Sequence, residues 1–303
     1  MTFGEHVFLY CERGTNTALL AEPINALSNL AFLFAALIGL QLVLWRPREE
    51  RDADHFLLVG LVFLIGLGSL AFHLLATQET ELLDVIPISV FMIVYFGFAL
   101  NRFLGVPPAW TVLVVCGFAA IVAVTMQVQC SEGAIGFFGP DVQGLKPCLN
   151  GSLFYLPALL ALIVVGLTLS ERGHRAAPWL LWAAAIFAIS ITLRSLDMAF
   201  CDKVLIEGRR VGTHFTWHVL NGLALFLLLR ASLEGGPAFV TRARPPLGET
   251  SEAQVKGPAA PRPAEGTRAL RPLAERVASA TEEAAKGDEA PEGEGERRSF
   301  FPA

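Results

Sequence analysis

The chain has 303 residues, of which 53% are hydrophobic and only 17% are charged, and its formal net charge at pH 7 is −5. This composition is typical of an integral membrane protein and argues against an ordinary water-soluble domain. The lipid bilayer is therefore an expected partner, and no nucleic acid is expected. Residues 1–14 lack a basic leading region followed by an apolar core, so we expect no cleavable signal peptide.

Seven apolar runs reach, or nearly reach, the roughly 17 to 25 residues that a helix needs to cross a membrane. Backbone polar groups in lipid must bond within their own segment, which favours helices. The long continuous apolar character, with little alternation, also argues against a β-barrel. We therefore expect an all-α membrane protein, a bundle of seven transmembrane helices. The expected helices are 26–44, 56–76, 83–100, 110–128, 152–169, 178–200 and 212–233.

Arginine is concentrated in alternate loops of this topology. The positive-inside rule places such short basic loops in the cytoplasm, so the N-terminus is expected outside and the C-terminus in the cytoplasm. Lys203, Arg209 and Arg210, in the loop before the last helix, oppose this trend. The arginines that carry the prediction are Arg46, Arg48, Arg51, Arg102, Arg172, Arg175, Arg230, Arg242 and Arg244.

The topology divides the chain into three parts. Residues 1–25 form an extracytoplasmic N-terminal segment, and residues 26–234 form the seven-helix domain. Residues 235–303 are rich in Pro, Ala, Gly, Glu and Arg, so we expect a disordered cytoplasmic tail. The preference for arginine over lysine and the Ala-rich tail suggest a GC-rich, bacterial genome. The expected location is therefore the bacterial inner membrane, with the outer face in the periplasm.

Four of the five cysteines fall in segments that are expected outside: Cys11, Cys130, Cys148 and Cys201. Disulfides persist in oxidising compartments, so this distribution agrees with the topology. Four cysteines allow three connectivities, of which Cys11 with Cys201 and Cys130 with Cys148 is one. Four free thiols are the alternative.

Five polar side chains are expected at one depth, near the outer boundary of the membrane. Ser69 and His73 lie one helical turn apart at the outer end of the second helix, and Asp84 lies in the first turn of the third. His214 and His218 are four residues apart at the start of the seventh, so both imidazoles share one helix face. Histidine within a membrane-spanning segment indicates function.

Three neutral imidazoles leave one open position on a tetrahedral metal, as in catalytic zinc sites. Asp84 is placed to transfer protons, and Ser69 is placed to hydrogen-bond a developing oxyanion. This pattern predicts hydrolysis of an ester or amide at the membrane surface. Each residue alone has a simpler explanation: a histidine can bond a neighbouring helix, Ser69 a backbone carbonyl of its own helix, and Asp84 can favour the helix N-terminus.

Three further residues have expected structural roles. Arg194 and Asp197, three apart in the sixth helix, are expected to pair with each other or with Asp84, because unpaired charges at that depth are costly. Trp217 is expected to face away from the two histidines beside it and to act as an aromatic anchor at the membrane interface.

The chain resembles the alkaline ceramidases, in the seven-helix hydrolase superfamily that includes the progestin and adiponectin receptor-like proteins. The resemblance runs through CERGTNTALLAEPINALSNLAF, GSLAFHLLATQETELLDVIP, LRSLDMAFCDK and GTHFTWHVLNG. It implies a zinc-dependent amidase that cleaves the N-acyl bond of ceramide, or of a related N-acyl lipid, to a sphingoid base and a fatty acid. The implied zinc ligands are His73, His214 and His218, with Asp84 and Ser69 as catalytic residues.

The resemblance also implies two features of the N-terminal segment. Cys11 and Cys201 match the positions that the family joins by a disulfide. The family's eukaryotic members bind calcium through acidic and amide side chains of this segment, a pattern that Glu12, Glu22 and Asn16 fit, although the segment here is one residue shorter and Leu9 replaces an acidic residue. Calcium normally takes six to eight oxygens.

Two other functions fit the same pattern. The first is a seven-helix lipid receptor or sensor with a structural zinc, which would keep its metal but would not turn over substrate. The second is an acyl hydrolase that acts on a glycerolipid or a lipid-anchored protein.

Overall fold

The computed structural model describes residues 4–131, 134–137 and 146–235. The expected disordered tail lies outside the described residues from position 236 onward. In chain order the helices are α1 (Pro23–Ser28), α2 (Leu30–Leu44), η1 (Arg48–Glu50), α3 (Ala53–Leu75), α4 (Gln78–Phe98), η2 (Ala99–Phe103), α5 (Pro108–Met126), η3 (Leu153–Tyr155), α6 (Leu156–Glu171), α7 (Ala177–Ser195) and α8 (His214–Ser232). The strands are β1 (Gln129–Ser131), β2 (Ala134–Gly136), β3 (Lys146–Pro147), β4 (Leu205–Ile206) and β5 (Arg209–Arg210).

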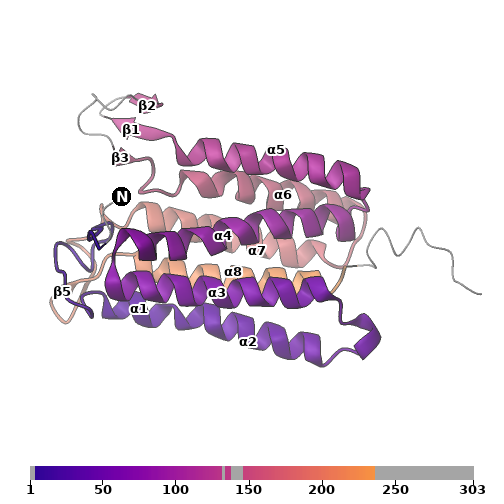
Figure 1. Ribbon diagram of the computed structural model, residues 1–303, viewed down its shortest axis with the longest axis horizontal. Helices are drawn as coiled ribbons and strands as arrows, with labels where there is room; N and C mark the ends of the chain where they lie inside the picture. Colours follow the sequence, from indigo (N-terminus) through magenta and orange to yellow (C-terminus); the bar gives the residue numbers. More distant parts are fainter. Residues whose placement is uncertain (1–3, 132–133, 138–145, 236–303) are drawn as a thin grey trace, which may run out of the picture. The chain divides into compact units, whose positions relative to one another are not determined.

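The described residues contain seven helices long and apolar enough to cross a membrane, which confirms the expected fold class. Each packs against the next in the chain, and α8 also packs on α2, so by these contacts the seven helices close into a ring. Figure 1 shows the helices lengthwise, running side by side. In the most apolar stretch of α3 and of α8, 56% of the residues are buried, against 11% in that of α5. The helices that carry the three histidines are therefore the most enclosed.

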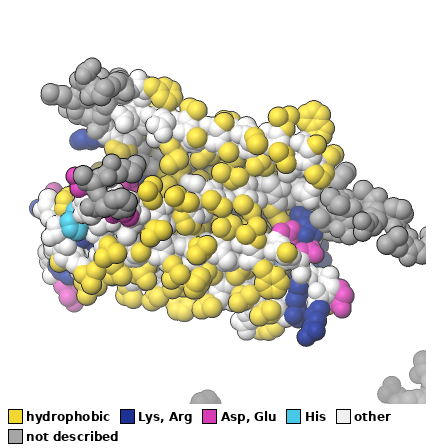
Figure 2. Space-filling view, viewed as in Figure 1, with side chains coloured by type: hydrophobic (Ala, Val, Ile, Leu, Met, Phe, Trp, Pro, Cys, Tyr) yellow, Lys and Arg dark blue, Asp and Glu magenta, His cyan; other side chains and the backbone are white. Residues whose placement is uncertain are grey.

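Apolar side chains cover the outside of this ring as well as its interior. On the face shown in Figure 2, hydrophobic side chains spread over the middle of the helices, and charged ones gather toward the two ends. Large apolar residues such as Trp45, Leu113 and Trp182 are more than half exposed. In water such a surface would drive aggregation, whereas in a bilayer it is the surface that contacts lipid.

The sequence predicted the helices but misplaced some of their ends. The third spanning helix begins at Gln78 rather than at residue 83, because the Thr77 and Thr80 side chains form a capping box there. A hydropathy pattern detects only the apolar part of such a helix. Asp84 consequently lies in the second turn of α4, so its predicted place in the first turn, as a helix-terminal carboxylate, is wrong.

The sixth spanning helix ends at Ser195, not at residue 200. The apolar residues that follow form a turn, because the Asp197 carboxylate accepts hydrogen bonds from backbone N–H groups outside α7. The chain then crosses the β4–β5 hairpin and enters α8.

Two disulfides lie at one end of the bundle: the Cys11–Cys201 pair that the resemblance implies, and the Cys130–Cys148 pair that belongs to one of the three possible connectivities. Cys11 and Cys201 join the N-terminal segment to the turn after α7, and Cys130 and Cys148 close the loop between α5 and α6. The second loop carries a small antiparallel sheet of order β2-β1-β3. In Figure 1 both loops lie at the end of the helices near the N-terminus. Cys116, in α5, is an exposed free thiol.

Helices α3 and α4 approach each other closely at Gly68. A Cβ atom at this position would lie 1.9 Å from the backbone oxygen of Leu83 and 3.3 Å from the backbone nitrogen of Asp84. Because the obstacle is backbone, it cannot rotate away. Gly68 therefore fixes how far Asp84 lies from the helix that carries Ser69 and His73.

We expect Gly68→Ala to destabilise the protein by roughly 1–3 kcal/mol, because overpacking forces the two backbones apart. Turnover should fall as well, since Asp84 moves with α4. Unfolding in mixed micelles of denaturing detergent measures the first effect. Gly60→Ala, in the same helix but with open space around the added methyl group, is the matched control and should leave both quantities near wild type. Equal stability of the two variants would show that α3 and α4 can separate without cost.

Candidate functional site

Three imidazoles gather where the end of α3 meets the start of α8. His73 lies in the last turn of α3, and His214 and His218 lie on successive turns of α8, all at most 1% exposed. One ring nitrogen from each histidine lies within 4.8 Å of the other two. The sequence prediction that these three residues come together is met by the structure, and the group can hold a metal ion.

Two of the rings are oriented by polar partners. His73 Nδ1 lies 2.6 Å from Glu22 Oε2, and His218 Nδ1 lies 2.7 Å from Ser28 Oγ. A carboxylate oxygen can only accept, so the proton of His73 is on Nδ1. The Ser28 hydroxyl donates to the backbone carbonyl of Asn25, which directs its oxygen lone pair to His218. Both Nδ1 atoms then carry the proton, and both Nε2 atoms present a lone pair.

The two Nε2 atoms that present lone pairs face each other. His73 Nε2 and His218 Nε2 are 3.1 Å apart in a buried site. Two acceptors at this distance repel unless a cation lies close to both. Imidazoles held by a carboxylate or hydroxyl on the far nitrogen are the usual ligands of protein-bound metals, so the donor set fits a metal ion.

The third ring, His214, is held by stacking. The ring of Tyr10 lies parallel to it, with centroids 3.5 Å apart and an angle of 16° between the planes. Its Nδ1 is buried and has no hydrogen-bond partner among the described residues. Tyr10 is itself buried, which raises the pKa of its hydroxyl well above the usual value. The phenol is therefore neutral and closes one side of the histidine group.

Asp84 and Ser69 lie on adjacent helices beside this group. Ser69 is 2% exposed and lies next to the Asp84 carboxyl group. Asp84 Oδ1 is buried, and within the described part of the chain nothing hydrogen-bonds to it. A carboxyl oxygen without a partner is available for proton transfer. Asp84 does not belong to the group whose ligand atoms lie within 4.8 Å of one another.

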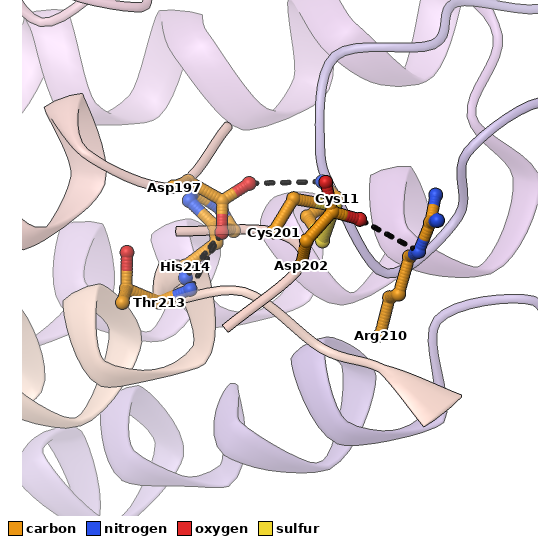
Figure 3. Close-up of a disulfide and its surroundings, with 7 residues drawn as sticks. All are labelled: Cys11, Asp197, Cys201, Asp202, Arg210, Thr213 and His214. Carbon is orange, nitrogen blue, oxygen red and sulfur yellow. Dashed lines mark hydrogen bonds and ion pairs between the residues drawn. A yellow bond between two sulfur atoms is a disulfide. The ribbon is translucent and has the colours of Figure 1, made fainter. Parts of the chain in front are cut away.

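Asp197 fixes the start of α8 and the disulfide to each other. Its carboxylate accepts from the backbone N–H of Cys11 at 2.9 Å, of Thr213 at 2.7 Å and of His214 at 2.9 Å (Figure 3). Burial raises the pKa of Asp197, although these hydrogen bonds oppose the effect. One side chain thereby holds both Cys11, which follows Tyr10, and the first turn of α8, which carries His214.

Arg194 does not pair with Asp197 or Asp84, so that prediction is wrong for the residues that the structure describes. Its guanidinium instead donates to the Asn150 carbonyl at 2.5 Å, the Ser152 hydroxyl at 3.0 Å and the Tyr10 hydroxyl at 3.0 Å. The loop between α5 and α6 therefore reaches the site through this arginine.

Trp217 is not an anchor at the membrane interface. It is 2% exposed and packs between Tyr155 and Phe187 inside the bundle, beneath the Arg194 guanidinium. The spacing predicted correctly that it points away from the histidines. It could not show that another helix covers that face of α8.

The residues expected to bind calcium are already engaged with other groups. Both oxygens of Glu12 accept from backbone N–H groups, those of Ile24 and Asn25, and burial raises its pKa. Asn16 Oδ1 accepts from the backbone of Ala18. Burial alone would raise the pKa of Glu22, but hydrogen bonds, first of all the one from His73, outweigh burial and hold its pKa below the usual value.

A second acidic group lies at the opposite end of α3. Asp52, Asp54 and His55 offer ligand atoms within 4.8 Å of one another. Arg102, from η2, contacts both carboxylates at 2.6–2.8 Å, so this group ties two loops together by charge. His55 lies buried in α3, which begins three residues before the start expected for this helix.

Sequence reasoning missed Tyr10, Arg13 and Ser28 and gave Glu22 a different role. One signal was present: if Cys11 pairs with Cys201, the residues beside Cys11 must lie near the start of α8. The exact contacts join residues up to 190 positions apart, and no local pattern encodes them.

A comparison with known proteins identifies the family of the chain. A protein-family model described as Ceramidase matches residues 8–233, which is well over half of the chain and includes every residue of the histidine group and its partners. No curated protein matches the sequence. The chain belongs to the ceramidase family.

Proposed function

We propose that the chain is a zinc-dependent transmembrane amidase that cleaves the N-acyl bond of ceramide or a related N-acyl lipid. The products are a sphingoid base, or another amine, and a fatty acid. Membership of the ceramidase family makes the chain a hydrolase of ceramide-like lipids. The identity of the metal and of the lipid are the parts that we propose.

The observation that carries the proposal is the approach of His73 Nε2 to His218 Nε2 at 3.1 Å. With His214 these rings form an all-imidazole donor set, and zinc is the ion that such sets most often hold in hydrolases. Bound there, zinc supplies Lewis-acid chemistry: it makes a water acidic near neutral pH and polarises an acyl carbonyl. Glu22 and Ser28 hold the rings in the tautomer that this binding requires.

Asp84 and Ser69 supply the remaining chemistry. The free Oδ1 of Asp84 accepts a proton from the attacking water and passes it to the amine nitrogen. The nitrogen must be protonated before the amine can leave. Ser69 donates a hydrogen bond to the acyl oxygen as negative charge develops on it. Asp84 can serve as the base because it lies outside the group of metal ligands and its Oδ1 is free to accept a proton.

The interior of the bundle supports a lipid substrate. An apolar cavity of about 60 Å³ lies between α3, α4, α5, α6, α7 and α8. Its lining includes Ile65, Phe91, Leu225 and Asn221, the last of which lies one turn beyond His218 on α8. A cavity of this volume would hold only a short part of an acyl chain, against an apolar lining.

The chain is an integral, multi-pass membrane protein. We propose that the end of the bundle with the histidines faces the periplasm of a bacterium, in the outer leaflet of the inner membrane. Both disulfides lie at this end, and disulfides form in oxidising compartments. The arginine-rich loops lie at the other end, in agreement with the positive-inside rule.

A lipid panel tests the proposal. Purified protein in lipid nanodiscs is incubated with N-acyl sphingoid bases, N-acyl ethanolamines, diacyl glycerolipids and an acylated peptide, and products are measured by mass spectrometry. We expect the N-acyl sphingoid lipids to be consumed with equal release of free base and fatty acid. A preparation of His73→Ala provides the background. Cleavage of ester lipids alone would replace the amidase by an acyl hydrolase, and no consumption of any lipid would contradict both.

A further inference from the structure

Arg13 occupies a cage of oxygen atoms in the N-terminal segment. The side chain is 3% exposed. Its guanidinium donates to Glu22 Oε1 at 2.5 Å, to the backbone oxygens of Asn16 and Ala18 at 3.1 Å each, and to those of His73 and Leu74 at 2.8 and 3.3 Å. The N-terminal segment, the start of α1 and the end of α3 thus meet at one cation.

A carboxylate and several carbonyl oxygens are the ligands that a hard cation such as Ca²⁺ takes in proteins. Here the positive charge is that of the Arg13 guanidinium, and its five N–H groups can donate to several oxygens at once. The last carbonyls of α3 belong to this set, and they have no partner within the helix. Arg13 therefore satisfies groups that would otherwise be buried without hydrogen bonds.

The side-chain oxygens that the resemblance assigns to calcium, those of Glu12, Asn16 and Glu22, already accept other hydrogen bonds. Glu12 and Asn16 accept backbone N–H groups with their side-chain oxygens. Glu22 is shared by Arg13, Asn25 and His73. A calcium ion needs six to eight oxygens and would have to displace these donors while lying next to a fixed positive charge. The residues present do not fit the calcium site that the family resemblance implies.

The Arg13 guanidinium is connected to His73 in two ways. It contacts Glu22, whose other oxygen holds His73 Nδ1, and it contacts the backbone oxygen of His73 itself. Removal of the guanidinium would free both the carboxylate and the end of α3. The orientation of the His73 ring depends on both.

We propose that the Arg13 guanidinium stands in for a bound calcium ion, so that the protein is independent of calcium, and that Arg13 is a positioning residue for His73 through Glu22. The second half rests on the proposed zinc site. The first half does not, because it concerns the N-terminal segment alone.

Calcium binding is measured first, on wild-type protein in calcium-depleted buffer. We expect no stoichiometric calcium in the purified protein by mass spectrometry of metals, no heat of binding on titration with CaCl₂, and no change in the midpoint of thermal unfolding. One calcium per chain, with a rise in that midpoint, would overturn the stand-in role.

Zinc affinity is measured next, in competition with a zinc-binding dye. We expect Arg13→Met, which keeps much of the volume but not the charge, to weaken zinc binding by roughly 10- to 100-fold, the usual cost of losing support for a ligand. Arg13→Lys should recover part of the loss, since it restores the charge but not the planar donor set. Arg210→Met is the control, because Arg210 is exposed and its ion pair is with the exposed Asp202.

Wild-type zinc affinity in Arg13→Met, or no recovery in Arg13→Lys, would overturn the positioning role. If Arg13→Met does not fold, the lysine variant and the wild-type calcium measurement still decide the proposal. None of these readouts uses turnover. A failure to hydrolyse ceramide would therefore contradict the proposed function and leave this result standing.

Discussion

Replacement of His218 by alanine is expected to reduce lipid hydrolysis to background and to lower the zinc content from about one ion per chain to near zero. His218 supplies one of three converging ring nitrogens, and its Nε2 lies 3.1 Å from that of His73. Two imidazoles hold zinc far less tightly than three. The same result is expected for His73→Ala. Metal content by mass spectrometry and release of fatty acid from N-acyl sphingoid lipid measure the two effects.

The control for this experiment is His6→Ala. His6 lies at the same end of the protein, is exposed, and stacks on Phe8 rather than on the histidine group. It should retain both zinc and turnover. Circular dichroism of each variant shows whether the helices are intact. Normal turnover in His73→Ala and His218→Ala would rule out the proposed metal centre.

Asp84→Asn is expected to separate catalysis from metal binding. The amide has nearly the same shape as the carboxylate but cannot accept the proton of the attacking water. Turnover should fall by roughly 10²- to 10⁴-fold, the usual contribution of a general base. Zinc content should remain at the wild-type level, because Asp84 lies outside the group of ligand atoms.

Ser69→Ala serves as the graded comparison. It removes one hydrogen-bond donor beside Asp84 and should cost turnover while zinc is retained. Single-turnover rates and zinc content are measured on the same preparations. If Asp84→Asn hydrolyses lipid at the wild-type rate, Asp84 is not the base. If neither wild type nor variant turns over any lipid while both hold zinc, the chain is better explained as a receptor with a structural metal.

The helices and the meeting of the histidines were predictable because both follow from simple periodicity. A membrane helix needs a long apolar run, and a helix places positions four apart on one face. Once the topology was set, Ser69 and His73 had to lie at the same depth as His214 and His218. The same topology placed four cysteines on one side of the membrane, although it left three connectivities open.

The failures have a common cause. Asp84 was placed one turn too early because Thr77 and Thr80, which start α4, are polar and extend the helix beyond its apolar run. Arg194 and Asp197 were expected to pair because they are close in sequence, whereas each finds partners from distant loops. Arg13 gave no signal at all, since the oxygens that surround it come from three separate segments. Hydropathy describes contacts with lipid, and it does not describe contacts between loops.

The disulfide between Cys11 and Cys201 anchors the N-terminal segment beside the histidine group. Tyr10, Arg13 and Glu22 all lie in this segment, and each contacts His73 or His214. A chain folded in a reducing compartment would lack this disulfide. If the proposed function is right, formation of the active enzyme depends on an oxidising compartment on this side of the membrane.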